Sequence, residues 1–284
     1  MASHVYKFLP PDRSDFFSNL TLRFTQPTEL NDPFECLPQL KEIDVDEMLE
    51  GVIKRTSGKI LSTAKSPVDA FSKFMMIEGG REIMSKQYKA DPSLLRDIFF
   101  QKFKNNLATS FGILSLSTRS DSPVMWSSYC SEHKGFVVCF NPDHSFFQHQ
   151  YNDNPDIGQL TDVIYSVDRP SVDINSVQIP INLLLHKDID WRYENEKRLI
   201  RRLDCATKTI IKDSVPVCLF AVPPEAVTGV CFGMKCPSEK KQQIIKDIST
   251  RGDLSHVVMS DAKLDYNQFR VRMEPIIGVA VVKV

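Results

Sequence analysis

The stretch Trp191-Arg192-Tyr193-Glu194-Asn195-Glu196-Lys197-Arg198 is the most informative part of this sequence, because it sets two acids and three bases among aromatic residues. The hydrophobic pair Leu199-Ile200 follows it directly. A solvated surface helix rarely carries a Trp and a Tyr in so charged a segment, and a core strand rarely takes five charges. Aromatic walls that exclude water strengthen the electrostatic contacts beside them. The segment therefore predicts one wall of a polar pocket, and the competing interpretation is a surface element whose charges pair locally.

The composition is that of an ordinary globular protein. The 284 residues are 42% hydrophobic and 25% charged, and the net charge is -1. That balance excludes a global electrostatic attraction to nucleic acid or to anionic membranes. No run of about eighteen apolar residues occurs, so we expect no membrane span. The seven cysteines are scattered, and no recognisable signal peptide precedes them, so we expect reduced thiols and a cytoplasmic protein.

The order of sequence patterns predicts one α+β domain over residues 1–284, with a helical insertion at residues 41–109. Apolar spacing predicts helices over residues 45–54 and 92–103, and the second opens on Asp91-Pro92 as a cap and first turn. A further helix is expected over residues 237–250. We expect a mixed or antiparallel, split β-sheet, with strands at residues 5–8, 21–25, 112–117, 135–140, 162–167, 215–222, 227–232, 256–260, 269–273 and 276–284.

Most familiar catalytic motifs are missing from the sequence. It contains no G-x-G-x-x-G, no Cys-x-x-Cys and no G-x-S-x-G, which removes support for a dinucleotide fold, a paired-cysteine zinc site and a nucleophile elbow. One metal-dependent nuclease pattern stays open, in which Glu132-His133-Lys134 follows Asp121. The residues before Glu132 are polar, however, and not the apolar strand that would hold this acid in place.

A second polar segment is Asn31-Asp32-Pro33-Phe34-Glu35. Asn and Asp before Pro favour a turn in which their side chains accept hydrogen bonds from nearby amides. In one interpretation the segment only ends the strand at residues 21–25. In the other, Phe34 anchors a rigid loop so that Asn31 or Glu35 can meet a ligand.

A third polar segment covers residues 125–136. On a helix, Trp126, Tyr129 and His133 would share one face, and Gly135 would end that turn before a strand begins. The segment is either a short helix whose aromatics pack on the sheet or an aromatic face of a ligand site. In the second case, the aromatics and His133 would stack on a planar ring such as a nucleobase or nicotinamide.

These segments share an order with several shorter motifs along most of the chain: Tyr6-Lys7-Phe8, Leu22 to Glu35, Met125-Trp126-Ser127-x-Tyr129 with His133-x-Gly135, Trp191-x-Tyr193-Glu194-x-Glu196-x-Arg198 and Pro223-Pro224-Glu225. In that order they resemble the bacterial domain-of-unknown-function family numbered 2971 (DUF2971). Lys197 stands where that family tends to carry a Trp. The resemblance implies a related fold and no particular reaction.

The motif order is also similar to that of ADP-ribosyltransferase-type domains, which are split α+β folds with a Glu or Glu-x-Glu late in the chain. This resemblance implies NAD as substrate, with Glu194-x-Glu196 as the late acids, Tyr6 or Lys7 on the first strand, Trp126 and Tyr129 as the nicotinamide wall, and Arg198 on the diphosphate. Together with the polar segments above, it makes Glu194, Glu196, Tyr129 and His133 the candidate catalytic residues and adds Asn31, Asp32, Glu35 and Trp191 to the candidate NAD-binding residues. We expect no metal ion. Cleavage of the nicotinamide–ribose bond builds positive charge on the sugar, which one carboxylate stabilises while a second activates the acceptor.

Three functions stay open at this point. The first is an NAD-consuming enzyme, an ADP-ribosyltransferase or NAD glycohydrolase, in a toxin or phage-defence role. The second is a sensor or partner-binding module that binds a nucleotide-like small molecule without turnover, and the third is the nuclease. The sequence names neither a protein or nucleic-acid acceptor nor the oligomeric state. It also leaves open whether Glu194 and Glu196 share a face, as on a strand, or diverge by about 200°, as on a helix.

Overall fold

The computed structural model describes residues 4–41, 44–149, 151, 157–172 and 181–276. Contacts divide the chain into two compact units. The first comprises residues 1–36, 108–167 and 184–284, and the second comprises residues 37–107 and 168–183. The expected single-domain organisation stays a prediction.

The second unit is mainly helical. Its helices are α2 (Val45–Leu61), α3 (Pro67–Ala90) and most of α4 (Pro92–Ser110), and a short parallel pair joins β3 (Gln39–Leu40) to β8 (Ser171–Val172). Local capping explains where the helices begin. The Asp44 carboxylate accepts the first free amides of α2, and the Asp91 carboxylate accepts the amide of Ser93 at the start of α4. The helices expected over residues 45–54 and 92–103 are therefore present, and both extend further along the chain.

Helix α3 was not predicted from the sequence. None of its side chains is buried, and its apolar residues are spread around the helix and form no stripe. A period of 3.6 residues reveals a helix only where one face is apolar. Without that stripe, residues 67–90 carry no periodic signal.

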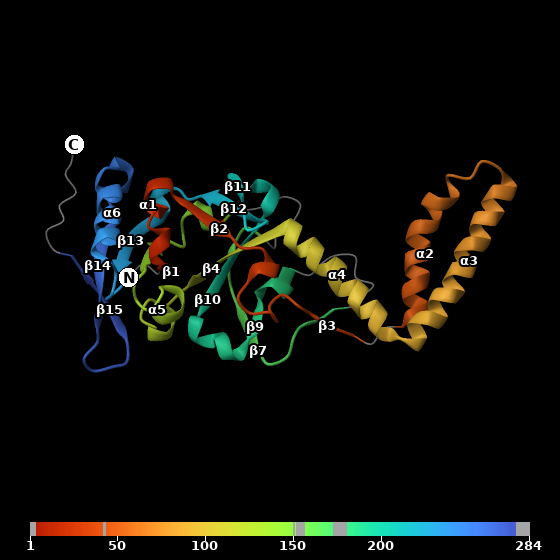
Figure 1. Cartoon of the computed structure of the whole chain (residues 1–284), viewed down its shortest axis with the longest axis horizontal. Helices are drawn as coiled ribbons and strands as arrows, with labels where there is room; N and C mark the ends of the chain where they lie inside the picture. The colour runs from red at the N-terminus through yellow and green to blue at the C-terminus, as the bar shows by residue number, and fades with distance from the viewer. Residues whose placement is uncertain (1–3, 42–43, 150, 152–156, 173–180, 277–284) are drawn as a thin grey trace. The chain divides into compact units, whose positions relative to one another are not determined.

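The first unit is built on a mixed eight-stranded sheet (Figure 1). Its strand order is β15-β14-β13-β5-β1-β4-β10-β6, and the neighbours are antiparallel except for the parallel pair β13–β14. The strands are β1 (Val5–Leu9), β4 (Phe111–Ser117), β5 (Phe136–Phe140), β6 (Leu160–Asp162), β10 (Glu196–Arg202), β13 (Val227–Phe232), β14 (Val258–Leu264) and β15 (Val271–Pro275). The α+β fold class is thus confirmed.

The remaining elements are smaller. Strands β2 (Thr21–Phe24), β11 (Lys208–Lys212) and β12 (Val215–Ala221) form an antiparallel sheet, and β7 (Ile164–Ser166) pairs with β9 (His186–Asp188). The α-helices are α1 (Phe16–Asn19), α5 (Pro123–Tyr129) and α6 (Ser238–Ser249). Short 3₁₀ helices are η1 (Pro11–Arg13), η2 (Pro27–Glu29), η3 (Ser145–Phe147), η4 (Ile181–Leu185), η5 (Ile189–Glu194), η6 (Leu203–Cys205), η7 (Pro224–Ala226) and η8 (Gly252–Leu254).

Two sequence expectations need comment here. The expected last strand at residues 276–284 lies, apart from its first residue, outside the described residues. Among the residues that are described, no helix has both the length and the apolar character needed to cross a bilayer.

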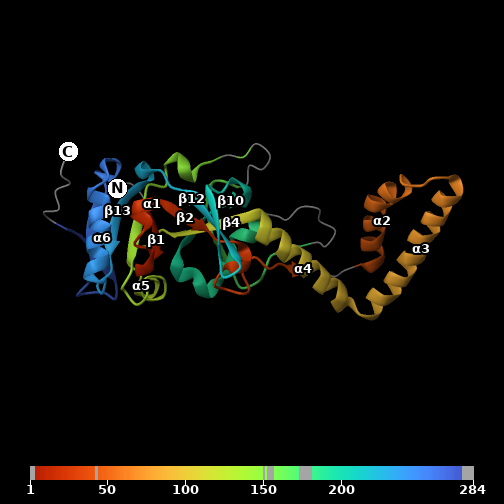
Figure 2. The ribbon, with the colours of Figure 1, turned by 45° about the horizontal axis from the view of Figure 1, so that its top comes forward.

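Strand alternation creates an apolar layer on each face of the large sheet. On one face, Phe136 and Val138 pack with apolar side chains of α1 and α6, and α6 runs beside β13 and β14 (Figures 1 and 2). On the other face, Val137 and Cys231 pack with Trp126 of α5. This is the period-2 pattern of a strand that is buried on both sides.

The sheet is split beside β4. Strand β1 pairs with β5 along its whole length, but its register with β4 is the single pair Tyr6–Ser117. Further along β4, Ile113 exchanges backbone hydrogen bonds of 2.8 and 2.9 Å with Thr25. Between these two points, the Ser115 carbonyl of β4 accepts a hydrogen bond from the Lys7 ammonium at 2.9 Å. A side chain thus takes the place of a strand partner for this backbone group.

Gly135 tests how tightly β5 is held against β1. A Cβ added to Gly135 would lie 2.0 Å from the Leu9 carbonyl oxygen, whereas one added to Gly252 would meet nothing within 4 Å. We expect Gly135→Ala to lower the free energy of unfolding by about 1–3 kcal/mol through backbone displacement. Urea unfolding followed by tryptophan fluorescence measures this, since Trp126 and Trp191 both lie in the first unit. Gly252→Ala is the matched control, and equal stability of the two variants would contradict the close approach.

Candidate functional site

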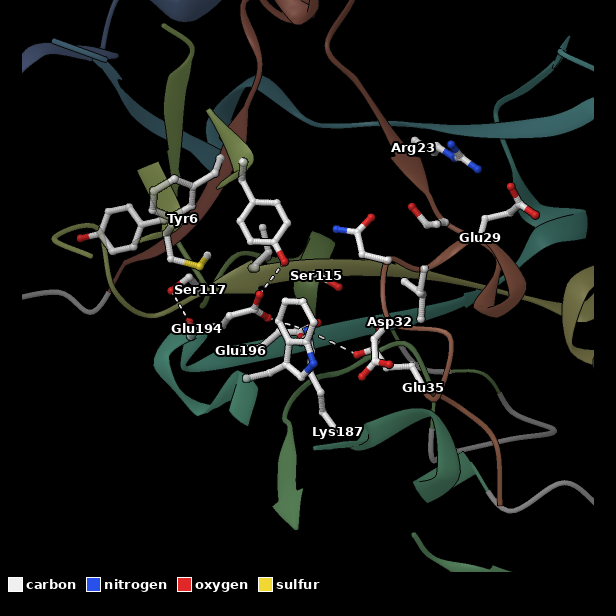
Figure 3. Close-up of a pocket in the computed structure, with 18 residues that line it drawn as sticks. Tyr6, Arg23, Glu29, Asp32, Glu35, Ser115, Ser117, Lys187, Glu194 and Glu196 are labelled. Atoms are coloured by element: carbon white, nitrogen blue, oxygen red, sulfur yellow. Dashed lines mark hydrogen bonds and ion pairs between the residues drawn. The ribbon is translucent and has the colours of Figure 1, made fainter. Parts of the chain in front are cut away.

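A cavity of about 240 Å³ lies at this split in the sheet (Figure 3). Its walls come from β1, β2 and β4, from helix α5, from residues 29–35 and from residues 187–196. The register explains part of the arrangement, since Tyr6 pairs with Ser117 and Ser117 pairs with Glu196 on the far side of β4. These three side chains therefore form one row across three strands.

The charged segment at residues 191–198 is neither a continuous helix nor a continuous strand. Helix η5 begins where the Asp188 carboxylate accepts the amide of Asp190 at 2.9 Å, and it ends at Glu194. Asn195 then adopts a left-handed conformation with φ of 43°, and β10 starts at Glu196. With this single left-handed residue between the helix and the strand, both carboxylates reach the same ammonium group.

That group is the Lys187 ammonium, which is surrounded by three carboxylates. Its Nζ lies 2.6 Å from Glu194 Oε2, 3.1 Å from Glu196 Oε2 and 3.3 Å from Glu35 Oε1. Arg198 contacts Glu35 and lies 2.8 Å from Glu196, and its Nη1 donates to the Leu184 carbonyl at 2.6 Å. All five side chains are buried, so three acids share two cations away from bulk water.

The two late acids differ in proton affinity. Burial raises the pKa of Glu194 and outweighs the opposing effect of Lys187. Burial also acts upward on Glu196, but Arg198 and Lys187 together hold its pKa at about 2. For Lys187 itself, the neighbouring carboxylates overcome burial and raise the pKa. Glu196 is thus a fixed negative charge, whereas Glu194 is the acid that accepts a proton more readily.

Tyr129 connects helix α5 to this network. Its hydroxyl donates to Glu194 Oε1 at 2.5 Å, and burial followed by the nearby Glu194 charge raises its pKa, so it stays protonated as a donor. Ser117 donates to the Glu194 carbonyl at 2.6 Å, which holds the end of η5 against β4. The Trp191 ring lies 4.7 Å from the Lys187 ammonium, in the geometry of a cation–π contact.

The loop at residues 29–35 brings Glu35 into the network. The Asp32 carboxylate accepts the amide of Phe34 at 2.9 Å, and the Asp32 carbonyl accepts the amide of Glu35 at 3.1 Å. The Asx turn expected from Asn31-Asp32-Pro33 is therefore present at Asp32. The Phe34 side chain, which was expected to anchor the loop, is 61% exposed.

The structure brings together most of the residues singled out from the sequence. The pocket is lined by Tyr6, Asn31, Asp32, Glu35, Tyr129, Trp191, Glu194 and Glu196. Two more support the wall from behind: Arg198 is fully buried against Glu196, and Lys7 satisfies the Ser115 carbonyl. Burial, the largest effect, lowers the pKa of Lys7 to about 8.

Trp126 and His133 do not line this pocket. Trp126 is fully buried, packs edge-on against Phe8 and donates to the Ser120 carbonyl at 2.8 Å. Helix α5 ends before His133, which has φ of 68° and stacks on Trp126 with ring centroids 6.2 Å apart. The aromatic face expected from Trp126, Tyr129 and His133 is therefore divided: Tyr129 lines the pocket, whereas Trp126 packs on Phe8 and His133 stacks on Trp126.

The residues of the nuclease pattern also lie outside the lining of the pocket. Glu132 is exposed and pairs with Lys134 at 2.9 Å. Asp121 lies 2.8 Å from Arg119 and 3.4 Å from Arg270. These are local ion pairs of the kind that surface charges form.

Both cations that line the pocket were missed from the sequence. Lys187 lies in the charged run His186-Lys187-Asp188, next to the segment that was singled out, and that proximity was the available signal. Arg23 alternates with Leu22 and Phe24 in β2, and this pattern is typical of a strand whose polar face meets solvent. Nothing in the sequence indicates that Arg23 faces a pocket.

Comparison with known proteins gives one partial match. Residues 125–199 of the 284 match a family model described as "Protein of unknown function (DUF2971)". The matched part contains Tyr129, Lys187, Glu194, Glu196 and Arg198, whereas the earlier motifs lie outside it. No curated protein and no solved structure matches the chain, so the resemblance to ADP-ribosyltransferases gains no support from these comparisons.

Removing the ammonium at the centre of the network should be costly. We expect Lys187→Met to lower the free energy of unfolding by about 3–5 kcal/mol, because it leaves buried carboxylates without their counterion. Lys187→Met with Glu194→Gln should recover part of this loss. Lys197→Met is the control, since Lys197 pairs with a well-exposed Asp162 and should cost below about 1 kcal/mol. Urea unfolding measures all three, and equal losses at both lysines would contradict the network.

The two late acids should also titrate in a fixed order. As pH falls, Glu194 should take up a proton above the ordinary Glu value of about 4.3, while Glu196 stays ionised toward about 2. Ionised Glu196 therefore stabilises the fold above that ordinary value, and the stabilisation is lost as pH falls through the folded pKa. The effect of Glu194 on stability has the opposite sign. Ionisation of this carboxyl lowers the free energy of unfolding, and protonation restores it. NMR of ¹³C-labelled glutamate carboxyls checks the order, and protonation of Glu196 first would refute it.

Proposed function

We propose that this pocket binds the nicotinamide–ribose part of NAD and that the protein cleaves the bond between nicotinamide and ribose. The observation that carries the proposal is the excess of carboxyl groups over cations in the lining of the pocket. Five carboxyl side chains line the pocket, Glu29, Asp32, Glu35, Glu194 and Glu196, against the cations Arg23 and Lys187. Arg198 behind the wall still leaves more acids than bases.

A pocket with this balance favours positive charge. The nicotinamide ring of NAD is cationic, and bond cleavage transfers that charge to the ribose in the transition state. Fixed carboxylates beside the developing charge stabilise it, and they do so more strongly where water is excluded. The size of the cavity supports the same assignment, since about 240 Å³ is below the roughly 300–1,000 Å³ of pockets that hold drug-sized ligands. It fits one end of a dinucleotide.

The two late acids support different roles. Glu196 stays ionised between Arg198 and Lys187, which suits electrostatic stabilisation of the sugar cation. Glu194 is held by Tyr129 and Lys187 and exchanges its proton more readily, which suits a general base. A pair of acids whose environments push their pKa values apart is the pattern of acid–base catalysis.

The proposed step is a hydrolysis. The bond between ribose C1′ and the nicotinamide nitrogen breaks, and its electron pair stays on that nitrogen, so the ring becomes neutral nicotinamide. A water oxygen bonds to C1′, and the proton that it loses passes to Glu194 and then to solvent. NAD and water thus give ADP-ribose, nicotinamide and a proton. An acceptor hydroxyl or amine in place of the water would give ADP-ribosyl transfer.

Incubation of the purified protein with NAD tests this proposal. Nicotinamide release, followed by chromatography, should fall by about 10²- to 10⁴-fold in Glu194→Gln, because the general base is lost. Tyr129→Phe keeps the ring and removes the hydroxyl that orients Glu194, so nicotinamide release by this variant should fall by a smaller factor. Glu132→Gln is the control, since Glu132 is exposed and lies outside the pocket.

Each variant is accepted only if its circular dichroism and urea midpoint match those of a folded protein. Intact NAD after prolonged incubation with wild-type protein, in the presence of protein and nucleic-acid acceptors, would overturn the enzymatic proposal. Saturable binding of ADP-ribose without any release of nicotinamide would identify a nucleotide-binding module instead.

A further inference from the structure

The Arg23 guanidinium lies in the pocket wall, and most of its donors have no hydrogen-bond partner in the part of the chain that the structure describes. Its Nε and Nη2 are shielded from solvent, and neither has a hydrogen-bond partner among the described residues. The same side chain lines the cavity. Shielded guanidinium nitrogens are normally paired, because an unmade hydrogen bond to a charged group is expensive. A group that pairs with Arg23 is therefore expected to come from outside the protein.

The strand holds Arg23 in this place firmly. Leu22 and Phe24 are buried in the main core on one face of β2, so Arg23 and Thr25 must point to the other face, and both line the cavity. Antiparallel pairing with β12 sets Arg23 opposite Leu219. Two core side chains and a strand pairing thus fix the backbone beneath the guanidinium.

The two ends of the pocket differ in charge. Lys187 and Arg198 are both neutralised by carboxylates, as described above. Arg23 lies away from them, toward the end of the pocket opposite Tyr6, where Glu29 is the nearby labelled acid (Figure 3). Glu29 is exposed to solvent. One end of the cavity therefore presents fixed carboxylates, and the other presents a cation with unused donors.

We propose that Arg23 forms an anion subsite that takes the phosphate group of a ribosyl phosphate. Guanidinium groups bind phosphate through short charge-assisted hydrogen bonds. A ribosyl phosphate has the matching polarity, since positive charge develops at C1′ while the phosphate on C5′ is anionic. The inference rests on the proposed function in placing the ribosyl group in this pocket, and it does not depend on turnover.

Titration with uncleavable probes tests the subsite. Ribose 5-phosphate and ribose differ by one phosphate, and inorganic phosphate carries that group alone. Protein-detected NMR should show wild-type protein binding ribose 5-phosphate about 10- to 100-fold more tightly than ribose, and Arg23→Met should reduce this preference to near one. Arg23→Met should leave ribose binding unchanged. Arg272→Met is the control, because Arg272 pairs at the surface with Glu274 and lies outside the pocket.

A second measurement separates binding from a structural role. Without ligand, Arg23→Met should unfold in urea at the same or a higher midpoint than wild type, because it removes donors that have no partner. A clearly lower midpoint would assign Arg23 to the fold and overturn the subsite. The same conclusion follows if the preference for ribose 5-phosphate survives in Arg23→Met, or if wild-type protein binds neither phosphate probe.

Failure of the proposed function has a different signature. If inorganic phosphate binds and depends on Arg23 while the ribosyl probes do not bind, the anion subsite stands and the ribosyl assignment is wrong. If ribose 5-phosphate binds through Arg23 while NAD stays intact, the subsite stands and the enzymatic step is wrong.

Discussion

The contact between the Lys187 ammonium and three buried carboxylates is the interaction on which this site depends. It joins Glu35 from an N-terminal loop to Glu194 and Glu196 from a segment more than 150 residues later, as the separation of 163 between Glu35 and Arg198 illustrates. Removing one charge from such a group leaves the others unpaired in a medium that solvates them poorly. The loop, η5 and β10 therefore hold their positions together, and the pocket wall is as rigid as the ion network.

The split in the sheet provides the space for this network. A strand edge left open inside a protein exposes backbone groups that need partners. Here Lys7 donates to the Ser115 carbonyl, and Thr25 closes the edge again at Ile113. Between Ser117 and Ile113 of β4, side chains therefore occupy the place where a continuous sheet would have its next strand. Lys7 and Thr25 thus satisfy the Ser115 carbonyl and both Ile113 backbone groups beside the polar cavity.

The polar groups of the cavity are held in place before any ligand arrives. The Glu194 carboxylate is fixed by Tyr129 from α5 and by Lys187 from β9, so it does not need to reorganise when charge develops nearby. Arg198 does the same for Glu196 from within β10. Fixed dipoles and charges of this kind favour a polar transition state over bulk water. Arg23 differs, because strand pairing fixes its backbone while its Nε and Nη2 have no hydrogen-bond partner among the described residues.

The sequence by itself determined the α+β class, most strands, the helices with an apolar stripe or an Asp cap, and the polar character of residues 191–198. These features depend on local spacing, which a sequence displays directly. Only the tertiary structure decided that Trp126 is core, that Asn195 turns both late acids onto Lys187, and that Arg23 faces a cavity. An Arg in an alternating strand or a Trp in a polar segment has the same local signature in either environment. The two environments differ in the side chains from distant parts of the sequence that contact the Arg or the Trp. Those contacts form only when the chain folds.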